Sequence, residues 1–150
     1  MALLDYAPEF TTAEAVEIAH RLFAIPVAAR TLPSERDQNF LLTLEDGEKR
    51  ILKIANARED PDLLEAENAV MLHVAGRGAA APRPFPTLDG DFVTRITGPN
   101  GNEHCVRLIS FLPGRPMGEV RRHSAGLLHD LGRRVGQLNR ALADFDHPAA

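Results

Sequence analysis

Two apolar runs flank a tight turn in the stretch NFLLTLEDGEKRILKIA, residues 39–55. Each run has the length of a β-strand, and Asp-Gly between two such runs is a strong short-range signal for a hairpin. We therefore predict that residues 39–45 and 49–55 pair as antiparallel neighbours in one sheet.

Lys53 is a charged residue inside the second of these apolar strands. Alternation places it on the sheet face that carries Ile51 and Ala55. A lysine among apolar neighbours loses hydration, so its ammonium must find an anionic partner or reach water. The first outcome would make Lys53 a functional cation, and the second an edge-strand lysine that discourages aggregation. The strand alone favours neither interpretation.

Further segments on both sides of the hairpin show helical or strand patterns. The predicted helices are residues 12–23, 60–75 and 124–145, and the additional predicted strands are residues 27–32, 91–96 and 103–112. Residues 77–86, rich in Gly, Ala and Pro, are predicted to be a connecting loop, and residues 112–116 to break the sheet. This order indicates an α+β fold: a five-stranded antiparallel sheet with a packed helix, an N-terminal helix, and a C-terminal helix after a hinge.

The helix predicted for residues 60–75 brings carboxylates near Lys53. Its apolar stripe predicts packing on the sheet and consists of Leu63, Ala66, Val70 and Val74. Glu67 lies at the border of that stripe, so it can face the strand and orient the Lys53 ammonium. Spacing alone also allows Glu65 and Glu67 to be ordinary solvent-facing residues.

Composition excludes several classes of function. The formal net charge is −4, and no basic stripe interleaved with aromatic residues is present, so we expect no nucleic-acid partner. The N-terminal residues have no signal-peptide pattern, and no apolar run approaches the roughly 20 residues of a membrane span, so we expect no membrane partner. The single cysteine, Cys105, cannot form an internal disulfide, and the histidines lack metal-ligand spacing. A cytoplasmic location is the simplest expectation.

The series from Leu52 to Val74 resembles the front lobe of the aminoglycoside phosphotransferase family, which includes choline, homoserine and hydroxylysine kinases and shares the protein-kinase-like fold. That pattern has a strand lysine, then a helix with a glutamate shortly before a Met-Leu-aromatic-Leu-like segment. Here Lys53, Glu67 and residues 71–74 (MLHV) occupy those places. The later stretch RLISFLPGRP, residues 107–116, resembles the family's last strand and hinge.

The resemblance extends from about Ala28 to Ala150 and is nearest to the hydroxylysine-kinase-like type. In some large bacterial proteins that type is fused ahead of a class III aminotransferase. It implies an ATP-binding lobe in residues 1–112, followed by a hinge and the first helical part of a second lobe in residues 113–150. The acceptor would be a small hydroxylated amine, amino acid or aminoglycoside-like substrate, bound by the missing lobe. An exposed lobe–lobe surface would favour self-association.

The resemblance also implies roles for individual residues in binding ATP with Mg²⁺. Lys53 would contact phosphate with Glu67 as its partner, and Ser34, in the glycine-free loop LPSERDQN (residues 32–39), would serve the phosphates. The Ser110 carbonyl and the Leu112 amide would hydrogen-bond adenine. Residues 129–130 (His-Asp) are interpreted as helix surface, so the catalytic loop and metal ligands are expected outside this chain, and the chain alone is expected to be inactive.

Two alternatives to a kinase lobe stay open. The glycine-free loop, which carries Glu35 and Asp37, favours a non-catalytic regulatory or interaction module that retains the shape of a kinase lobe. An unrelated α+β domain with a merely solvent-exposed Lys53 is the other. A Lys53 amine more than about 6 Å from every helix carboxylate would favour that last alternative, because an opposite charge beyond this range has little effect on it.

Overall fold

The predicted hairpin is present in the computed structural model, which describes residues 6–149. Its strands β2 (Gln38–Leu44) and β3 (Lys49–Ile54) pair antiparallel around a turn in which Gly47 has a φ of 83°. Glycine adopts this left-handed conformation without the steric cost of a Cβ atom. Residues 1–5, part of the segment for which we expect no signal peptide, lie outside the described residues.

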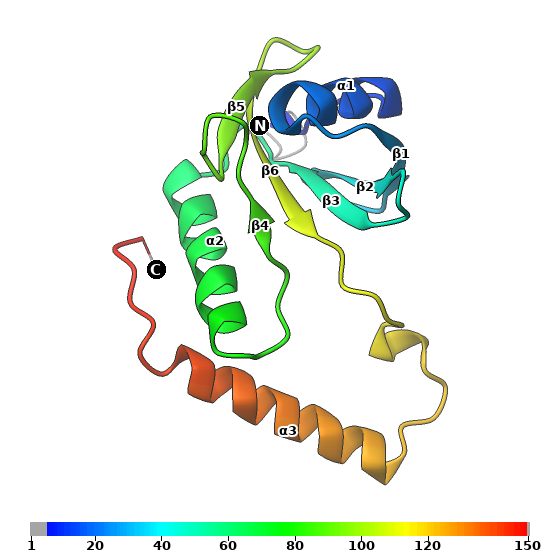
Figure 1. Ribbon diagram of the computed structural model, residues 1–150, viewed down its shortest axis with the longest axis vertical. Helices are drawn as coiled ribbons and strands as arrows, with labels where there is room; N and C mark the ends of the chain where they lie inside the picture. Colours follow the sequence, from blue (N-terminus) through cyan, green and yellow to red (C-terminus); the bar gives the residue numbers. More distant parts are fainter. Residues whose placement is uncertain (1–5, 150) are drawn as a thin grey trace.

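The remaining elements surround this hairpin (Figure 1). They are α1 (Thr12–Phe23), β1 (Val27–Leu32), α2 (Pro61–Gly76), β4 (Pro84–Phe85), β5 (Thr94–Thr97), β6 (Glu103–Ser110), the short 3-10 helix η2 (Met117–Glu119) and α3 (Ala125–Leu142). The sheet order is β1-β2-β3-β6-β4, with β5 also paired to β6, and every pairing is antiparallel. The α+β prediction with an antiparallel sheet is therefore confirmed.

One face of the sheet forms the main core. Phe40, Leu52 and Leu108 are register neighbours on β2, β3 and β6, and all three are fully buried. α1 covers this face and contributes Ala15 and Phe23, among others, to the same cluster (Figure 1). Because side chains alternate along each strand, the residues between these positions face the other side of the sheet, where α2 lies.

The sheet has one strand more than the sequence predicts. β4 lies within residues 77–86, the predicted loop, and pairs with β6 at Pro84 and Phe85. A two-residue strand containing proline has no alternating pattern, and proline is tolerated only at a sheet edge such as this one. The pairing is extended by Ser110, whose amide donates to the Arg83 carbonyl at 2.8 Å.

Four details of the predicted pattern are wrong, one of which is that α3 ends at Leu142 and not at residue 145. β5 covers Thr94–Thr97 instead of residues 91–96, and β6 ends at Ser110, two residues before the predicted end. In α2, Leu63 is 41% exposed, whereas its neighbour Leu64 is buried. The buried face of α2 includes the polar residue Asn68, so a stripe drawn through apolar residues alone is rotated away from it.

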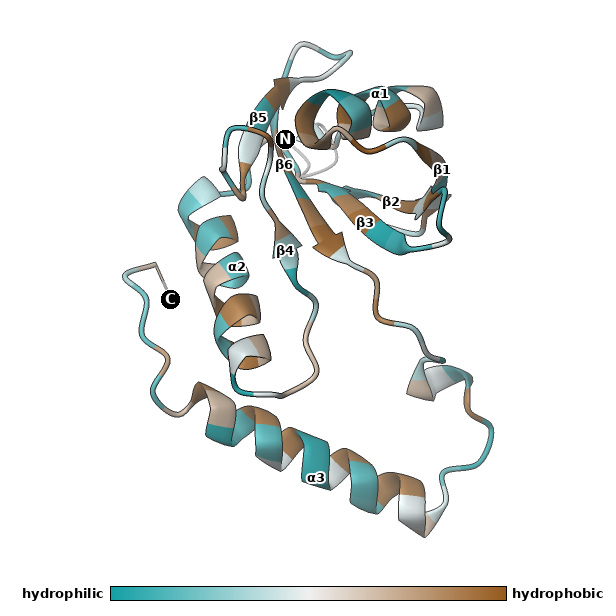
Figure 2. Ribbon diagram, in the orientation of Figure 1, coloured by the Kyte–Doolittle hydropathy of each residue, from teal (hydrophilic) through white to brown (hydrophobic). Residues whose placement is uncertain are grey.

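α3 is joined to α2, and apolar residues recur along it (Figure 2), several of them exposed. His73 of α2 contacts the Ala141 carbonyl through Nε2 at 2.9 Å, and Arg77 forms an ion pair with Asp144 just after α3. The exposed stripe residues are 39–50% accessible and comprise Leu128, Leu131, Val135 and Leu138. No helix within residues 6–149 has the length and apolar character needed to cross a membrane.

Candidate functional site

Lys53 lies on the sheet face opposite to the main core. It is the register partner of Asn39 on β2 and of Arg107 on β6, so the three residues form a polar row across the sheet. Partial burial, together with the positive charge of Arg107, lowers the pKa of Lys53 below its usual range, and the carboxylates of Asp37 and Glu67 oppose this change. A partly desolvated ammonium of this kind gains stability from an anionic ligand.

A concavity of about 360 Å³ opens beside this row between the sheet and α2. Its volume is in the range of small-molecule pockets. Three polar and three apolar residues line it: Lys53, Glu67, Arg107, Val70, Met71 and Ile109. The apolar side chains come from α2 and β6 and provide surface for a flat, weakly polar group, while Lys53 and Arg107 contribute positive charge.

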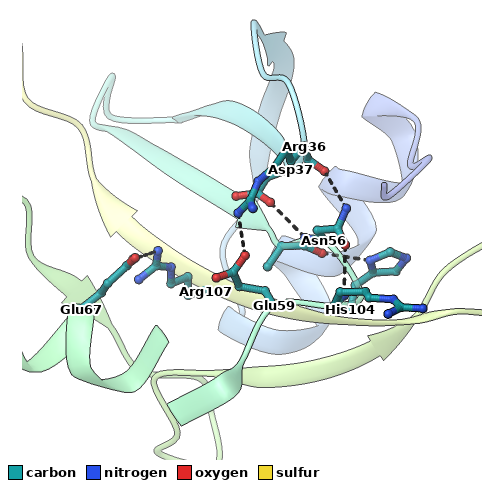
Figure 3. Close-up of polar contacts among 9 residues, drawn as sticks. Arg36, Asp37, Asn56, Glu59, Glu67, His104 and Arg107 are labelled. Carbon is teal, nitrogen blue, oxygen red and sulfur yellow. Dashed lines mark hydrogen bonds and ion pairs between the residues drawn. The ribbon is translucent and has the colours of Figure 1, made fainter. Parts of the chain in front are cut away.

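Glu67 reaches the same cavity as Lys53 but forms its ion pair with Arg107 (Figure 3). This differs from the direct Lys53–Glu67 pair that the resemblance implies. The reason is the strand order: β6 lies between β3 and β4, and α2 contacts β4, so Arg107 on β6 is nearer to the helix than Lys53 on β3. Glu67 still acts on Lys53 through space, since its charge raises the pKa of that lysine.

Arg107 is a residue of this cavity that our prediction missed. Its side chain is 7% exposed, and its guanidinium contacts the Leu64 carbonyl and Asn68 Oδ1, each at 3.4 Å, besides Glu67. The signal that could have found it is the one that singled out Lys53, namely a cation flanked by apolar residues inside a strand.

The glycine-free loop between β1 and β2 is held by its own side chains (Figure 3). Asp37 Oδ1 accepts a hydrogen bond from the backbone N–H of Asn56 at 3.0 Å, and Arg36 forms an ion pair with Glu59 at 2.7 Å. Both contacts fasten the loop to the segment that joins β3 to α2. The carboxylate of Asp37 therefore has a structural partner within the protein.

Ser34 lies in this loop, and Asn39 lies near the start of β2. Ser34 is exposed, and its hydroxyl oxygen accepts a hydrogen bond from Asn39 Nδ2 at 3.1 Å. The Asn39 amide oxygen is buried and has no hydrogen-bond partner among residues 6–149. An unused acceptor next to Lys53 in the cross-strand row is available to a donor from a ligand or from the lysine itself.

The predicted hinge begins where β6 ends at Ser110. The Ser110 amide and hydroxyl are both engaged with Arg83, at 2.8 and 2.9 Å. Leu112 follows in the extended segment that leaves the sheet and is 49% exposed. Ile109, one residue before Ser110, lines the cavity, so the hinge starts at the cavity's edge.

Within residues 6–149 no cluster of metal-ligating side chains lies at the cavity. Among the described residues no group of three His, Cys, Asp or Glu side chains is placed to hold a metal ion. Asp130, of the His-Asp dipeptide on α3, is paired with Arg133 and Arg134 on the helix surface. The interpretation of that dipeptide as helix surface is confirmed.

The strand order, the helix beside the sheet and the cavity with its strand lysine define the smaller lobe of a protein-kinase-like fold. The chain belongs to the phosphotransferase enzyme family, whose sequence model matches residues 28–150. The expected extent of the resemblance, from about Ala28 to Ala150, is confirmed.

Curated relatives support the same assignment. The chain is 32% identical to hydroxylysine kinase of Mus musculus over 154 residues, which cover 94% of this chain and 41% of the mouse protein. It is 33% identical to homoserine kinase of Xanthobacter autotrophicus over 109 residues, which cover 73% of this chain and 31% of that protein. The chain thus spans about two fifths of the mouse relative's length.

Among solved structures, the chain is similar to an amicoumacin kinase in complex with AMP-PNP, Ca²⁺ and Ami. The TM-score is 0.75 at 19% sequence identity, and the match covers 93% of this chain and 42% of the kinase. At this level of identity the likeness establishes the shared fold.

Proposed function

We propose that this chain is the ATP-binding lobe of a small-molecule kinase that phosphorylates a hydroxyl group of an amine, an amino acid or an aminoglycoside-like substrate. The observation that carries the proposal is the partly buried Lys53 at a cavity of about 360 Å³ with apolar walls. The relatives add support, because those named above phosphorylate hydroxylysine and homoserine according to their names.

In this proposal Lys53 contacts the phosphates of ATP. Its pKa is lowered chiefly by burial, which disfavours the protonated amine. An anionic phosphate bound beside it would stabilise that protonated form. Phosphoryl transfer relies on positioning and on charge stabilisation rather than on covalent chemistry by the protein. A fixed lysine beside the transferred group is suited to both tasks.

Adenine would occupy the apolar part of the cavity, against Val70, Met71 and Ile109. The Ser110 carbonyl and the Leu112 amide, at the start of the hinge, would then form its hydrogen bonds. The Ser34 hydroxyl, at the tip of the loop between β1 and β2, is our candidate for a further phosphate contact.

Mg²⁺ bound with ATP would supply positive charge that neutralises part of the phosphate charge. The donor set of this cavity fits the phosphates better than it fits the metal, because two of its three polar side chains are cations. We therefore propose that the metal ligands and the catalytic carboxylate lie outside this chain, and that the chain alone does not transfer phosphate.

We also propose that residues 1–112 form the ATP-binding lobe and that residues 113–150 begin a second lobe. The exposed stripe on α3 supports this boundary, since four large apolar residues are each 39–50% accessible on a helix whose main packing partner in this chain is α2. The remainder of a larger protein would cover the stripe and would bind the hydroxylated acceptor.

Titration of AMP-PNP with Mg²⁺ into the full-length protein that contains this chain tests the proposed function. We expect saturable binding by calorimetry, with a dissociation constant of roughly 1 μM to 1 mM, the usual range for enzyme substrates. AMP should bind more weakly than AMP-PNP, because it lacks the β- and γ-phosphates that Lys53 would contact. No heat of binding at millimolar AMP-PNP would refute the proposal and favour the non-catalytic module with a kinase-lobe shape.

A further inference from the structure

We propose that Arg107 is a positioning residue that binds Glu67 in place of Lys53 and fastens α2 to the sheet, so that the Lys53 ammonium stays available to the nucleotide. This inference rests on the proposed function, because it assigns Arg107 a task in the same cavity. It goes beyond that function because it assigns the pairing of Glu67 to Arg107 on β6 and not to Lys53 on β3.

The contacts of Arg107 all lie on one face of α2. The guanidinium contacts the carbonyl of Leu64 and the side chain of Asn68 through Nη1, and the carboxylate of Glu67 through Nη2. Residues three and four apart share one face of a helix, so these three positions form a single patch. The planar guanidinium therefore holds three positions of α2 against β6, and Figure 3 shows its contact with Glu67.

Burial makes this arrangement sensitive to its partners. The Arg107 side chain is 7% exposed, and a cation at such a site must be paired and hydrogen-bonded to be tolerated. Glu67, by contrast, is 49% exposed at the border of the cavity. The arginine is thus the buried member of the pair, and its position determines where the more exposed carboxylate lies.

Lys53 has no ion pair among residues 6–149. Its register partner on β6 is Arg107, which is also a cation. Like charges on adjacent strands repel each other, and the carboxylate on Arg107 offsets part of that repulsion. Because Glu67 is paired with Arg107, the Lys53 ammonium is not ion-paired within the protein. The phosphates of a bound nucleotide can then provide the missing negative charge.

Kinetics of the full-length protein with variants at both residues test the inference. We expect Arg107→Met and Glu67→Gln each to lower kcat/KM for ATP by about 10- to 100-fold, as is usual when a positioning partner of a charged group is removed. Arg107→Lys should fall between the wild type and Arg107→Met, because lysine keeps the charge but not the fork. The KM for the hydroxyl acceptor should not change.

The double variant and a matched control make the result specific. Mutations of residues that act as a unit have non-additive effects. The kcat/KM for ATP of Arg107→Met/Glu67→Gln should therefore lie no more than about threefold below that of the less active single variant. Arg95→Gln removes an exposed arginine that is paired with Glu103 on the same sheet, and we expect it to behave like the wild type. Multiplicative losses in the double variant would overturn the inference.

The pH profile supplies a readout that a merely structural role would not move. Three charged groups around Lys53 act on its pKa: Arg107 on β6 lowers it, while Asp37 before β2 and Glu67 on α2 raise it. ATP binding needs the protonated lysine, so kcat/KM for ATP falls as the pH rises through this pKa. Arg107→Met should move that alkaline fall to higher pH, and Glu67→Gln to lower pH. Shifts in the same direction, or none, would contradict the proposal.

Hydrogen exchange separates failure of this inference from failure of the proposed function. If the unmutated protein transfers no phosphate from ATP, the proposed function fails, and the nucleotide role of Arg107 fails with it. Whether Arg107 holds α2 on the sheet can still be tested without nucleotide. The rate of amide hydrogen exchange across α2 should rise in Arg107→Met and not in Arg95→Gln. If Arg107→Met does not fold, Glu67→Gln provides the same comparison. Unchanged exchange in α2 would overturn the fastening.

Discussion

Replacement of Lys53 by alanine is expected to lower kcat/KM for ATP by about 100- to 1,000-fold in the full-length protein, the usual loss for one preorganised charge contact in a transition state. The ammonium lies at the cavity with apolar walls, where partial burial would strengthen its interaction with a bound phosphate. The negative charge that develops during phosphoryl transfer would lose this partner. Steady-state kinetics with varied ATP and saturating acceptor measure the effect.

Lys49 provides a matched control, because it and Lys53 are the only lysines of the chain. Both lie on β3 and point to the same sheet face, since they are four residues apart. Lys49 is exposed and lies 5.9 Å from the ring centroid of Phe111, away from the cavity. Lys49→Ala should retain nearly full activity. Undiminished phosphorylation by Lys53→Ala would eliminate the phosphate-binding role.

The second large effect concerns the core that positions the site. Phe40 is fully buried at the centre of the sheet, where it lies next to Leu52 in the register and belongs to the cluster that contacts α1. Truncation of a buried phenylalanine to alanine costs about 3–5 kcal/mol, because burial is lost and a cavity remains. We expect Phe40→Ala to lower the free energy of unfolding by that amount in urea denaturation.

Leu88→Ala is the control for this loss, because Leu88 is 67% exposed and should change the free energy of unfolding by less than about 0.5 kcal/mol. Phe40 and Lys53 are on adjacent strands, so loosening the core should also disturb the register that places the lysine. A Phe40→Ala protein as stable as the wild type would show that the sheet face under α1 is not the main core.

Local signals were sufficient for the hairpin and its lysine. The Asp46–Gly47 turn fixes the register of β2 and β3, and that register places Lys53 on the face away from Phe40 and Leu52. Such information is contained in a few neighbouring residues, so it can be obtained from the sequence without knowledge of the tertiary structure.

Tertiary contacts decided what the sequence could not show. β4 is a strand only because β6 offers an edge beside Pro84, and no pattern within two residues can encode this. The choice of Arg107 over Lys53 as the partner of Glu67 depends on which strand lies nearer to α2. Apolar periodicity correctly predicted α3, but it could not predict that the stripe would remain exposed among the described residues.

The most direct test of the account is to label the full-length protein with an acyl-phosphate derivative of ATP. A lysine amine near the bound phosphates attacks the acyl group, forms an amide and releases ATP, and mass spectrometry identifies the modified residue. The lowered pKa of Lys53 increases the fraction of reactive amine. We predict that, of the two lysines in this chain, Lys53 is labelled, that excess ATP prevents this, and that Lys49 is not labelled. Labelling of Lys49 in preference to Lys53, or labelling of Lys53 that excess ATP does not reduce, would contradict the assignment of Lys53 as the phosphate contact.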